Sequence, residues 1–427
     1  MAALFVLCGP RCGLAAPPNV LLIISDDQGW SDFGFMGSDE IHTPHLDRLA
    51  AQSAVFTRGY VPTSVCRPSL ATIVTGLYPH EHGITSNDPD RGVSRDKMLR
   101  HIQQHATLPR LLAAEGFLSL QTGKWWEGDY HLGGFTHGMT VSGRHGGEGL
   151  TIGREGLEPI FEFLRDCDDS PFFVWFAPMM PHTPHNPPER LLAKYQADGR
   201  SPHTAAYAAM CEWFDESCGE LLEFLDREEL SQNTLVVFAV DNGWIQNPDI
   251  QWFLPRSKMS PYERGVRTPI MLRWPGRIQP SRDETMLIST IDLAPTILTA
   301  CGIRPSAAMP GIDLLSVING TPANRDILYG EIFTHDAFVI DQRAAGLMHR
   351  WCVTDQWKLI VPHAAAAATG PLGIRPDPRS PRDLATGRAA LFDVLSDPEE
   401  TRNLADERPE IVSSLRRKID NWWTGPE

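Results

Sequence analysis

The sequence predicts an α/β protein, with a large domain built on a mostly parallel sheet flanked by helices and a smaller α+β domain with an antiparallel sheet. Apolar runs of strand length alternate with helical segments through the first three quarters of the 427 residues, which is typical of parallel strands joined by helices. After about residue 315 the strand-like runs become shorter and alternate with polar residues, which favours antiparallel pairing. A chain of this length can bury a substantial core.

The elements of the large domain are expected in a regular order. The run 19–25 is apolar throughout and predicts a strand buried on both faces. A helix over 44–54 begins at Pro44, where a missing N–H costs nothing. The other expected elements are a helix over 108–116, strands over 117–122, 171–178, 234–240 and 268–274, a long amphipathic helix over 204–230, and a helix over 289–302.

The change of pattern sets the expected domain boundaries. We expect the large domain over 17–319 and the small domain over 320–427, with short strands in 327–333, 349–362 and 390–395 and a loop rich in alanine, proline and glycine over 363–383. Residues 1–16 form an apolar run that ends in small residues, which resembles a signal peptide without its basic start. We therefore expect an exported protein, periplasmic or secreted. The alternative is the frayed N-terminus of a cytosolic protein.

Composition and charge limit the possible partners. The net charge of −15, from 53 acidic and 38 basic side chains, argues against a nucleic acid partner. It also means that an anionic substrate must be held by local cations or a metal ion. No segment approaches the roughly 20 uninterrupted apolar residues that a membrane-spanning helix needs. The eight cysteines match no zinc-binding spacing and suggest no disulfide framework.

Acidic turns follow two of the predicted strands. Asp26 and Asp27 come directly after the first strand, and Asp241 and Asn242 come directly after the strand over 234–240. Because ligands of open α/β sheets bind at the carboxyl ends of strands, these four side chains are expected to converge there. Their oxygens suit a hard divalent cation, Ca²⁺ or Mg²⁺. The alternative is that each pair is only a polar turn, since Asp and Asn are favoured in turns.

Cationic side chains are expected at the same edge of the sheet. Three segments next to strand ends carry them: Lys124 beside Trp125 and Trp126, His182 and His185 in a proline-rich loop, and Lys258 with Arg264 and Arg267. Singly, such a lysine is more often a surface side chain and such a histidine a structural one. Together they predict a metal ion with Lys and His side chains that clamp an anion and protonate a leaving group.

Cys66 lies at the expected start of a helix, because Pro68 suits the first helical turn. The positive end of a helix would stabilise an anion or a developing negative charge near this thiol. The alternative is a small buried apolar residue, which is the commonest role of a free cysteine. The motifs elsewhere in the chain decide between the two.

The motifs taken together resemble a sulfatase of the alkaline-phosphatase superfamily, along nearly the whole chain. The segment from Cys66 to Ile84 resembles the Cys-x-Pro-Ser-Arg maturation motif with its trailing Thr-Gly. The other matching segments occur in the family's order, and they are PNVLLIISDDQGW, TGKWW, PHTPH, VDNGW, YERGVRTP, IDLAPTIL, MPGIDLL and DVLSDPEETRNLA.

The resemblance implies an alkaline-phosphatase-like fold and a role for each site residue. Asp26, Asp27, Asp241 and Asn242, together with the modified Cys66, would hold Ca²⁺ or Mg²⁺. A maturation enzyme would oxidise Cys66 to formylglycine, whose hydrated aldehyde attacks sulfur through one hydroxyl and expels the sulfate through the other. The sulfate oxygens would be clamped by Lys124 and Lys258, and the leaving oxygen would be protonated by His182, with His185 as the runner-up.

Two positions depart from the family pattern. Leu70 stands where the maturation motif has arginine, and the nearby Arg67 is expected to face elsewhere on the helix. Trp126 stands where a histidine usually follows Lys-Trp and serves as the base that expels sulfate. The candidates to replace that histidine are His80, His82 and His131.

The leading hypothesis is an exported hydrolase of sulfate esters, with a sulfated small molecule or glycan as substrate. One alternative is a phosphate or phosphonate ester hydrolase on the same scaffold, since a fold does not determine the substrate. The other, motivated by Leu70 and Trp126, is a non-catalytic homologue that binds the metal. Trp125 and Trp126 are either sugar-stacking or core side chains. The segments 84–107, 126–155 and 243–257 are the expected specificity loops.

Overall fold

A nine-stranded sheet forms the centre of the computed structural model, which describes residues 17–89, 92–337, 339–342, 344–363 and 387–425. The strand order is β4-β3-β5-β1-β6-β7-β2-β8, with β9 beside β2. Only β7 runs antiparallel to its neighbours within this sheet, so the predicted mostly parallel sheet is confirmed. The strands are β1 (Asn19–Ser25), β2 (Ala54–Tyr60), β3 (Leu118–Gly123), β4 (His137–Gly138), β5 (Phe172–Ala177), β6 (Thr234–Val240), β7 (Arg267–Arg273), β8 (Ser281–Asp283) and β9 (Ile288–Ser289).

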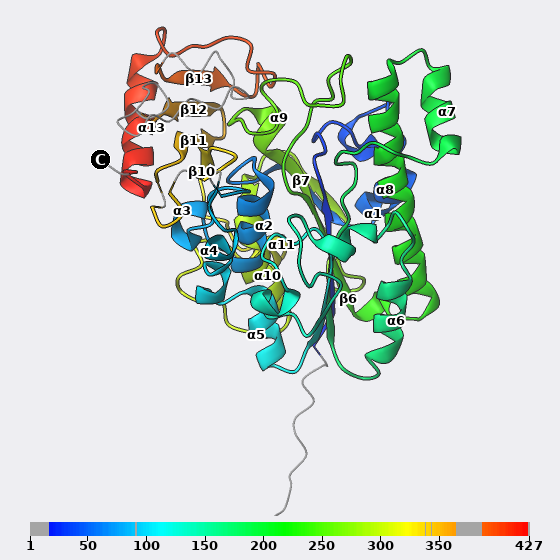
Figure 1. Ribbon diagram of the computed structural model, residues 1–427. Coiled ribbons are helices and arrows are strands. Elements are labelled where there is room, and N and C mark those ends of the chain that lie inside the picture. Colours follow the sequence, from blue (N-terminus) through cyan, green and yellow to red (C-terminus); the bar gives the residue numbers. More distant parts are fainter. Residues whose placement is uncertain (1–16, 90–91, 338, 343, 364–386, 426–427) are drawn as a thin grey trace, which may run out of the picture.

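Helices cover both faces of this sheet (Figure 1). One apolar layer packs α1 (Pro44–Ala51), α6 (Glu158–Asp166) and α8 (Pro202–Arg227) against the sheet. The layer on the opposite face contains α2 (Cys66–Thr75), α5 (Leu108–Ala114) and α10 (Leu293–Ala300). Shorter helices complete the large unit, namely α3 (Pro79–His82), α4 (Asp96–Leu99), α7 (Glu189–Ala197), α9 (Glu263–Val266) and α11 (Leu314–Ile318).

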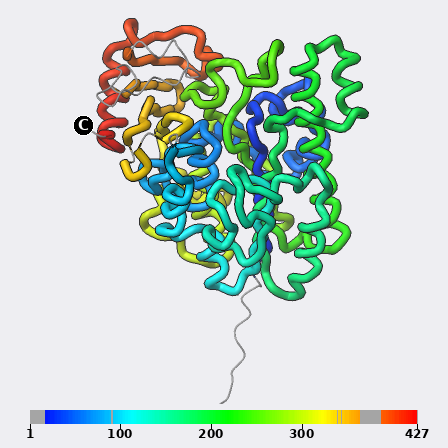
Figure 2. Tube along the Cα trace, viewed as in Figure 1, coloured from blue at the N-terminus to red at the C-terminus, as the bar shows by residue number. Residues whose placement is uncertain are grey.

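A separate antiparallel sheet of four strands lies to one side of the large sheet, as the sequence predicts (Figures 1 and 2). Its order is β10 (Ile327–Phe333), β11 (Leu347–Thr354), β12 (Trp357–Pro362) and β13 (Ala390–Asp393), and α13 (Pro409–Trp422) packs against it. An apolar cluster that includes Tyr60, Tyr262 and Trp351 joins this sheet to the large unit. Among the described helices, none is both long and apolar enough to cross a membrane. The expected signal segment and almost all of the loop 363–383 lie outside the described residues.

Two expectations about elements need correction. The helix expected over 44–54 ends at Ala51, because the chain enters strand β2 at Ala54. Strand β2 is absent from the predicted elements, because Arg58 interrupts its apolar pattern. Arg58 is nonetheless buried, because its guanidinium donates to Asp355 Oδ1 at 3.0 Å and to the carbonyl oxygens of Thr354 and Asp355 at 3.1 and 2.7 Å. A buried arginine in a strand is possible only because tertiary partners satisfy its donors.

Candidate active site

The acidic turns meet at the carboxyl edge of the sheet, where β1 and β6 lie side by side. Asp26 and Asp27 follow β1, and Asp241 and Asn242 follow β6. Asp27 adopts a left-handed conformation with φ of 62°, which turns the chain so that both carboxylates reach the same region. The Asp27 backbone N–H donates to Asp241 Oδ1 at 3.0 Å, and Asn242 Nδ2 donates to Asp27 Oδ1 at 2.6 Å. The two turns therefore form one buried cluster.

Two lysines enter this cluster. Lys124, directly after β3, places its Nζ 2.6 Å from Asp26 Oδ1. Lys258 comes from the loop before α9, and its Nζ lies 2.5 and 2.6 Å from the two oxygens of Asp27. Burial lowers the pKa of both lysines, but the nearby carboxylates outweigh it and raise the pKa of each above the ordinary lysine value. Both side chains therefore carry a positive charge at neutral pH.

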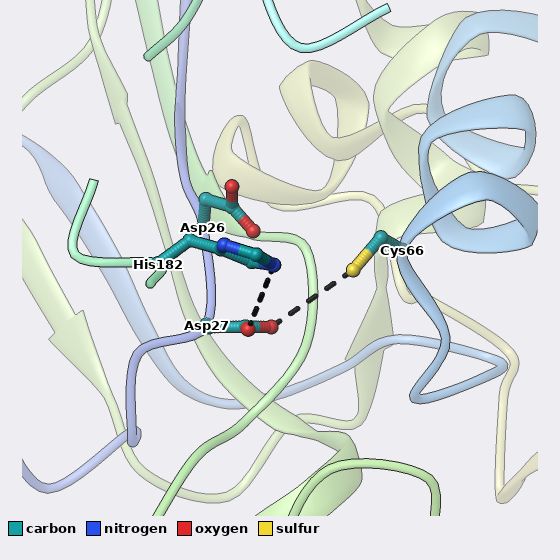
Figure 3. Close-up of side chains that lie close together, drawn as sticks. All are labelled: Asp26, Asp27, Cys66 and His182. Carbon is teal, nitrogen blue, oxygen red and sulfur yellow. Dashed lines mark hydrogen bonds and ion pairs between the residues drawn. The ribbon is translucent and has the colours of Figure 1, made fainter. Parts of the chain in front are cut away.

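Cys66 is the first residue of α2 and points into the same cluster (Figure 3). Its Sγ lies 3.0 Å from Lys258 Nζ and 3.4 Å from Asn242 Oδ1. Ser69, one turn further along α2, donates to the Asp241 carbonyl oxygen at 2.6 Å and so fixes the helix against the second acidic turn. Burial raises the pKa of the Cys66 thiol to about 12. A neutral thiol is a poor nucleophile, so the unmodified side chain is not suited to attack a substrate.

His182 faces Asp27 across the cluster (Figure 3). Its Nε2 lies 3.5 Å from Asp27 Oδ2, and its Nδ1–H donates to the Thr183 carbonyl oxygen at 2.6 Å. This bond fixes the tautomer and leaves Nε2 toward the cavity. His185 packs its ring against Tyr207 and Trp244 instead, with centroid distances of 5.6 and 6.3 Å. Of the two histidines in this loop, His182 is therefore the one placed to act on a substrate.

The donor set fits a hard divalent cation. Oδ2 of Asp26 and Oδ2 of Asp241 are both buried and have no hydrogen-bond partner. Burial raises the pKa of both carboxyl groups, which measures how unfavourable their charges are without a compensating cation. Three carboxylates face two lysines here, so a divalent ion would compensate the excess negative charge. The carboxylate and amide oxygens suit Ca²⁺ and Mg²⁺ alike.

A cavity of about 450 Å³ opens from this cluster. Asp27, His182 and Lys258 contribute to its wall. Each of the three segments expected to govern specificity also contributes, and those residues are Asn87, Trp126, Arg144, His145, Trp244, Gln251, Trp252 and Phe253. A cavity of this size is in the range that binds a small organic ligand rather than an inorganic ion alone.

The candidate replacements for the missing histidine need correction, because none of the three lines the cavity. His80 bonds Glu331 and stacks on Trp423, His82 is buried beside Thr72, and the exposed His131 bonds Asp129. Among the three cations of the segment 257–269, Lys258 is the one that reaches the cluster. Arg264 pairs with Glu399, and Arg267 packs on Trp30.

His145 is not among the predicted site residues, but it lines the cavity beside Trp126, with ring centroids 4.3 Å apart. The surrounding Gly-Arg-His-Gly-Gly run indicates a tight turn, but it does not indicate that this turn lines the cavity. Gly146 has φ of 142°, and a Cβ there would lie 2.4 Å from the Gly123 carbonyl oxygen. The His145 carbonyl oxygen accepts a bond from the Trp125 N–H at 2.8 Å. The glycine-rich turn thus packs directly against the segment that carries Lys124.

The two residues that depart from the family pattern, Leu70 and Trp126, are both buried. Leu70 and Trp126 belong to the apolar core beneath the site, and so does Trp125. Arg67 faces away from the cluster, as expected, and its guanidinium bonds both oxygens of Glu127 at 2.7 Å. The side chain of Trp126 still forms part of the cavity wall, whereas Trp125 serves the core.

A family model described as Sulfatase matches residues 18–303, which is more than half of the chain. The chain belongs to the sulfatase family. A second model, described as N-sulphoglucosamine sulphohydrolase, C-terminal, matches residues 250–385. The predicted resemblance to formylglycine-dependent sulfatases is therefore confirmed, with Leu70 in place of the motif arginine.

Known proteins of the family resemble this sulfatase over most of its length. N-acetylgalactosamine-6-sulfatase from Homo sapiens is 29% identical over 396 residues, which cover 81% of this chain and 74% of that protein. Arylsulfatase A from Bos taurus is 28% identical over 486 aligned residues, covering 95% of this chain and 87% of that protein. The crystal structure of Ps i-CgsB in complex with k-i-k-neocarrahexaose has the same fold, with a TM-score of 0.76 and 22% identity over 96% of this chain and 94% of that one. This sulfatase is thus a sulfuric ester hydrolase.

Proposed function

We propose that this sulfatase hydrolyses a sulfate ester of a carbohydrate, with Cys66 converted to formylglycine as the nucleophile. The observation that carries the proposal is the position of Cys66 Sγ, 3.0 Å from Lys258 Nζ and 3.4 Å from Asn242 Oδ1, inside a cluster that fits a divalent cation. The raised pKa of the thiol explains why a modification is needed, since hydroxyls of a hydrated aldehyde would replace a poor nucleophile.

Asp26, Asp27, Asp241 and Asn242 would hold Ca²⁺ or Mg²⁺. When bound, such an ion polarises sulfate oxygens and lowers the pKa of a neighbouring hydroxyl. Lys124 and Lys258 bind and orient the remaining sulfate oxygens, because both lysines are charged and reach the cluster. The deep burial of these side chains excludes water, which strengthens every charge interaction with the bound sulfate.

The histidines of the cavity divide the proton transfers. His182 acts through Nε2, because its Nδ1–H is held by the Thr183 carbonyl oxygen. Burial lowers the pKa of this imidazole, so Nε2 carries no proton at rest. It takes up the proton that the attacking hydroxyl releases and passes that proton to the leaving oxygen. His145 takes the place of the histidine that Trp126 replaces and accepts a proton. Its Nε2 contacts the Arg144 guanidinium, which can only donate, so the imidazole is neutral. Burial and the surrounding cations, Lys124 first, lower the pKa of His145, which keeps the imidazole neutral and makes it a weaker base. Bound anionic sulfate would offset these cations, so His145 takes up its proton while the sulfate is present. A proton on His145 Nε2 would displace the Arg144 guanidinium from that nitrogen. Arg144 would still be paired, because its Nε donates to Asp88 Oδ1 at 2.8 Å.

A carbohydrate is the proposed substrate class because the relatives include N-acetylgalactosamine-6-sulfatase and the cavity wall combines aromatic and polar side chains. The test compares inorganic sulfate release from an aryl sulfate and from sulfated mono- and oligosaccharides with phosphate release from an aryl phosphate. Wild-type enzyme coexpressed with a maturation enzyme should release sulfate, and Cys66→Ala should abolish this. Faster release of phosphate would favour the phosphate ester hydrolase. An unmodified Cys66 in protein from the native host, with no hydrolysis of any of these compounds, would favour the binding homologue.

A further inference from the structure

The loop between β6 and α9 forms a braced hairpin beside the cavity, seen as the green loop at the top centre of Figure 2. Gln246 and Phe253 pair as an antiparallel bridge, and the Leu254 N–H donates to the Ile245 carbonyl oxygen at 2.8 Å. The Gln246 side-chain amide donates to the Ile250 carbonyl oxygen at 2.9 Å. These bonds hold the hairpin and its side chains in a defined position.

One face of this hairpin continues an aromatic row that begins at the reacting centre. Lys258 Nζ lies 5.7 Å from the ring centroid of Trp244. Trp244 contacts Phe253 edge to face at 5.3 Å, and Phe253 stacks with Trp252 at 5.2 Å. All three rings line the cavity. Their exposed fraction rises from 3% for Trp244 through 6% for Phe253 to 40% for Trp252, so the row leads from the buried lysine to solvent.

An indole held in place at the mouth of a polar cavity is suited to stack on the apolar face of a sugar ring. Covering the exposed part of the Trp252 ring with the apolar face of a sugar would remove apolar surface from water and so favour binding. Polar side chains of the same cavity, namely Asn87, Arg144 and Gln251, can bond hydroxyl groups around such a ring. The sulfate group itself is held at the other end of the row, beside Lys258.

We propose that Trp252 forms a second sugar-binding subsite, which stacks on the sugar next to the sulfated residue. The substrate is then a sulfated oligosaccharide or polysaccharide rather than a free sulfated monosaccharide. This inference rests on the proposed function, because the sulfated sugar must be bound at Lys258 for its neighbour to reach Trp252.

The test compares KM for a sulfated monosaccharide and for a tetrasaccharide that carries the same sulfated residue at its end. The pair is chosen from sulfated galactose, N-acetylgalactosamine and glucosamine compounds as the one that the wild-type enzyme hydrolyses. Trp252→Ala should raise KM for the tetrasaccharide by about tenfold, and should raise KM for the monosaccharide much less. Trp252→Phe, which keeps a ring, should recover most of the difference. Ile250→Ala is the matched control, because Ile250 is 53% exposed on the same hairpin and lies outside the cavity wall.

Each outcome decides a different point. The subsite is overturned if Trp252→Ala raises KM equally for both substrates, or if Ile250→Ala raises KM for the tetrasaccharide as much as Trp252→Ala does. In either case, sulfate release by the wild-type enzyme would still support the proposed function. Failure of the wild-type enzyme to hydrolyse any compound of the panel, despite a matured Cys66, would overturn the proposed function and the subsite with it.

Discussion

The buried ion pair between Arg67 and Glu127 joins the helix that carries Cys66 to the segment after Trp126. The Arg67 guanidinium bonds both oxygens of Glu127 at 2.7 Å, and the two side chains are 1% and 4% exposed. Arg67 also donates to the carbonyl oxygens of Ser86 and Met98. Glu127→Gln keeps the size of the side chain but removes its charge, so it leaves a buried guanidinium without a counter-charge.

The expected loss of stability follows from this geometry. Two unit charges about 4 Å apart attract each other by about 4 kcal/mol at an effective dielectric constant of about 20. This value lies within the roughly 3–5 kcal/mol that loss of one partner of a buried pair costs. We therefore expect Glu127→Gln to lower the free energy of unfolding by about 4 kcal/mol, as measured by urea denaturation followed by circular dichroism.

Glu407→Gln is the matched control. Arg402 contacts both oxygens of Glu407 at 3.0 and 2.9 Å, but these side chains are 70% and 54% exposed. An exposed pair of this kind contributes only about 0–1 kcal/mol. If Glu127→Gln and Glu407→Gln lower the free energy of unfolding by the same small amount, the reasoning about the buried pair is refuted.

Further predictions concern the second sheet, pH, the metal ion and the cavity histidine. Lys358→Met should lower the free energy of unfolding by about 3–5 kcal/mol in urea denaturation, because Lys358 Nζ lies 2.9 Å from the buried Glu263. The control Lys418→Met, which removes an exposed ion pair with Asp326, should have little effect. Burial raises the pKa of Asp215 to about 7, so between about pH 4 and 7 the folded state holds a proton that the unfolded state has lost. The free energy of unfolding of the wild type, measured relative to that of Asp215→Asn, should therefore fall as the pH rises through this range. Removal of divalent ions with a chelator should lower Tm, and added Ca²⁺ should restore it, because of the unpartnered buried carboxylate oxygens. His145→Ala should lower kcat for sulfate release by at least about a hundredfold.

Each of these predictions has an outcome that would contradict it. Equal losses for the two lysine variants would mean that Lys358 is not needed as a counter-charge. A stability difference between wild type and Asp215→Asn that does not change with pH would contradict the raised pKa. An unchanged Tm after chelation and Ca²⁺ addition would contradict a metal ion at the cluster. A loss of kcat in His131→Ala, which alters an exposed histidine, as large as that in His145→Ala would show that the effect is not specific to the cavity.

Sequence patterns predicted the residues that follow the central strands better than those in the loops. Asp26, Lys124 and Asp241 come directly after apolar runs, and parallel strands bring such residues to one edge, so their convergence could be predicted. Strand β2 was missed because Arg58 breaks its apolar pattern, and the burial of Arg58 depends on tertiary contacts, among them those with Thr354 and Asp355.

The position of His145 could not be predicted because it depends on contacts between distant segments. Its turn packs on Gly123 and Trp125 through a close backbone approach that no local pattern encodes. The expected replacements His80 and His131 do not reach the cavity, because one bonds Glu331 and the other is exposed. Tertiary contacts, and not position along the chain, therefore decide which loop side chain enters the cavity.

The most direct test of the proposed mechanism is the mass of the peptide that spans residues 59–77, taken from enzyme produced with a maturation enzyme and from the native host. We expect the mass to show that sulfur is lost and an aldehyde is gained at Cys66, despite Leu70, in the preparation that releases sulfate. An unmodified cysteine in both preparations, together with undiminished sulfate release, would contradict a formylglycine nucleophile at this position.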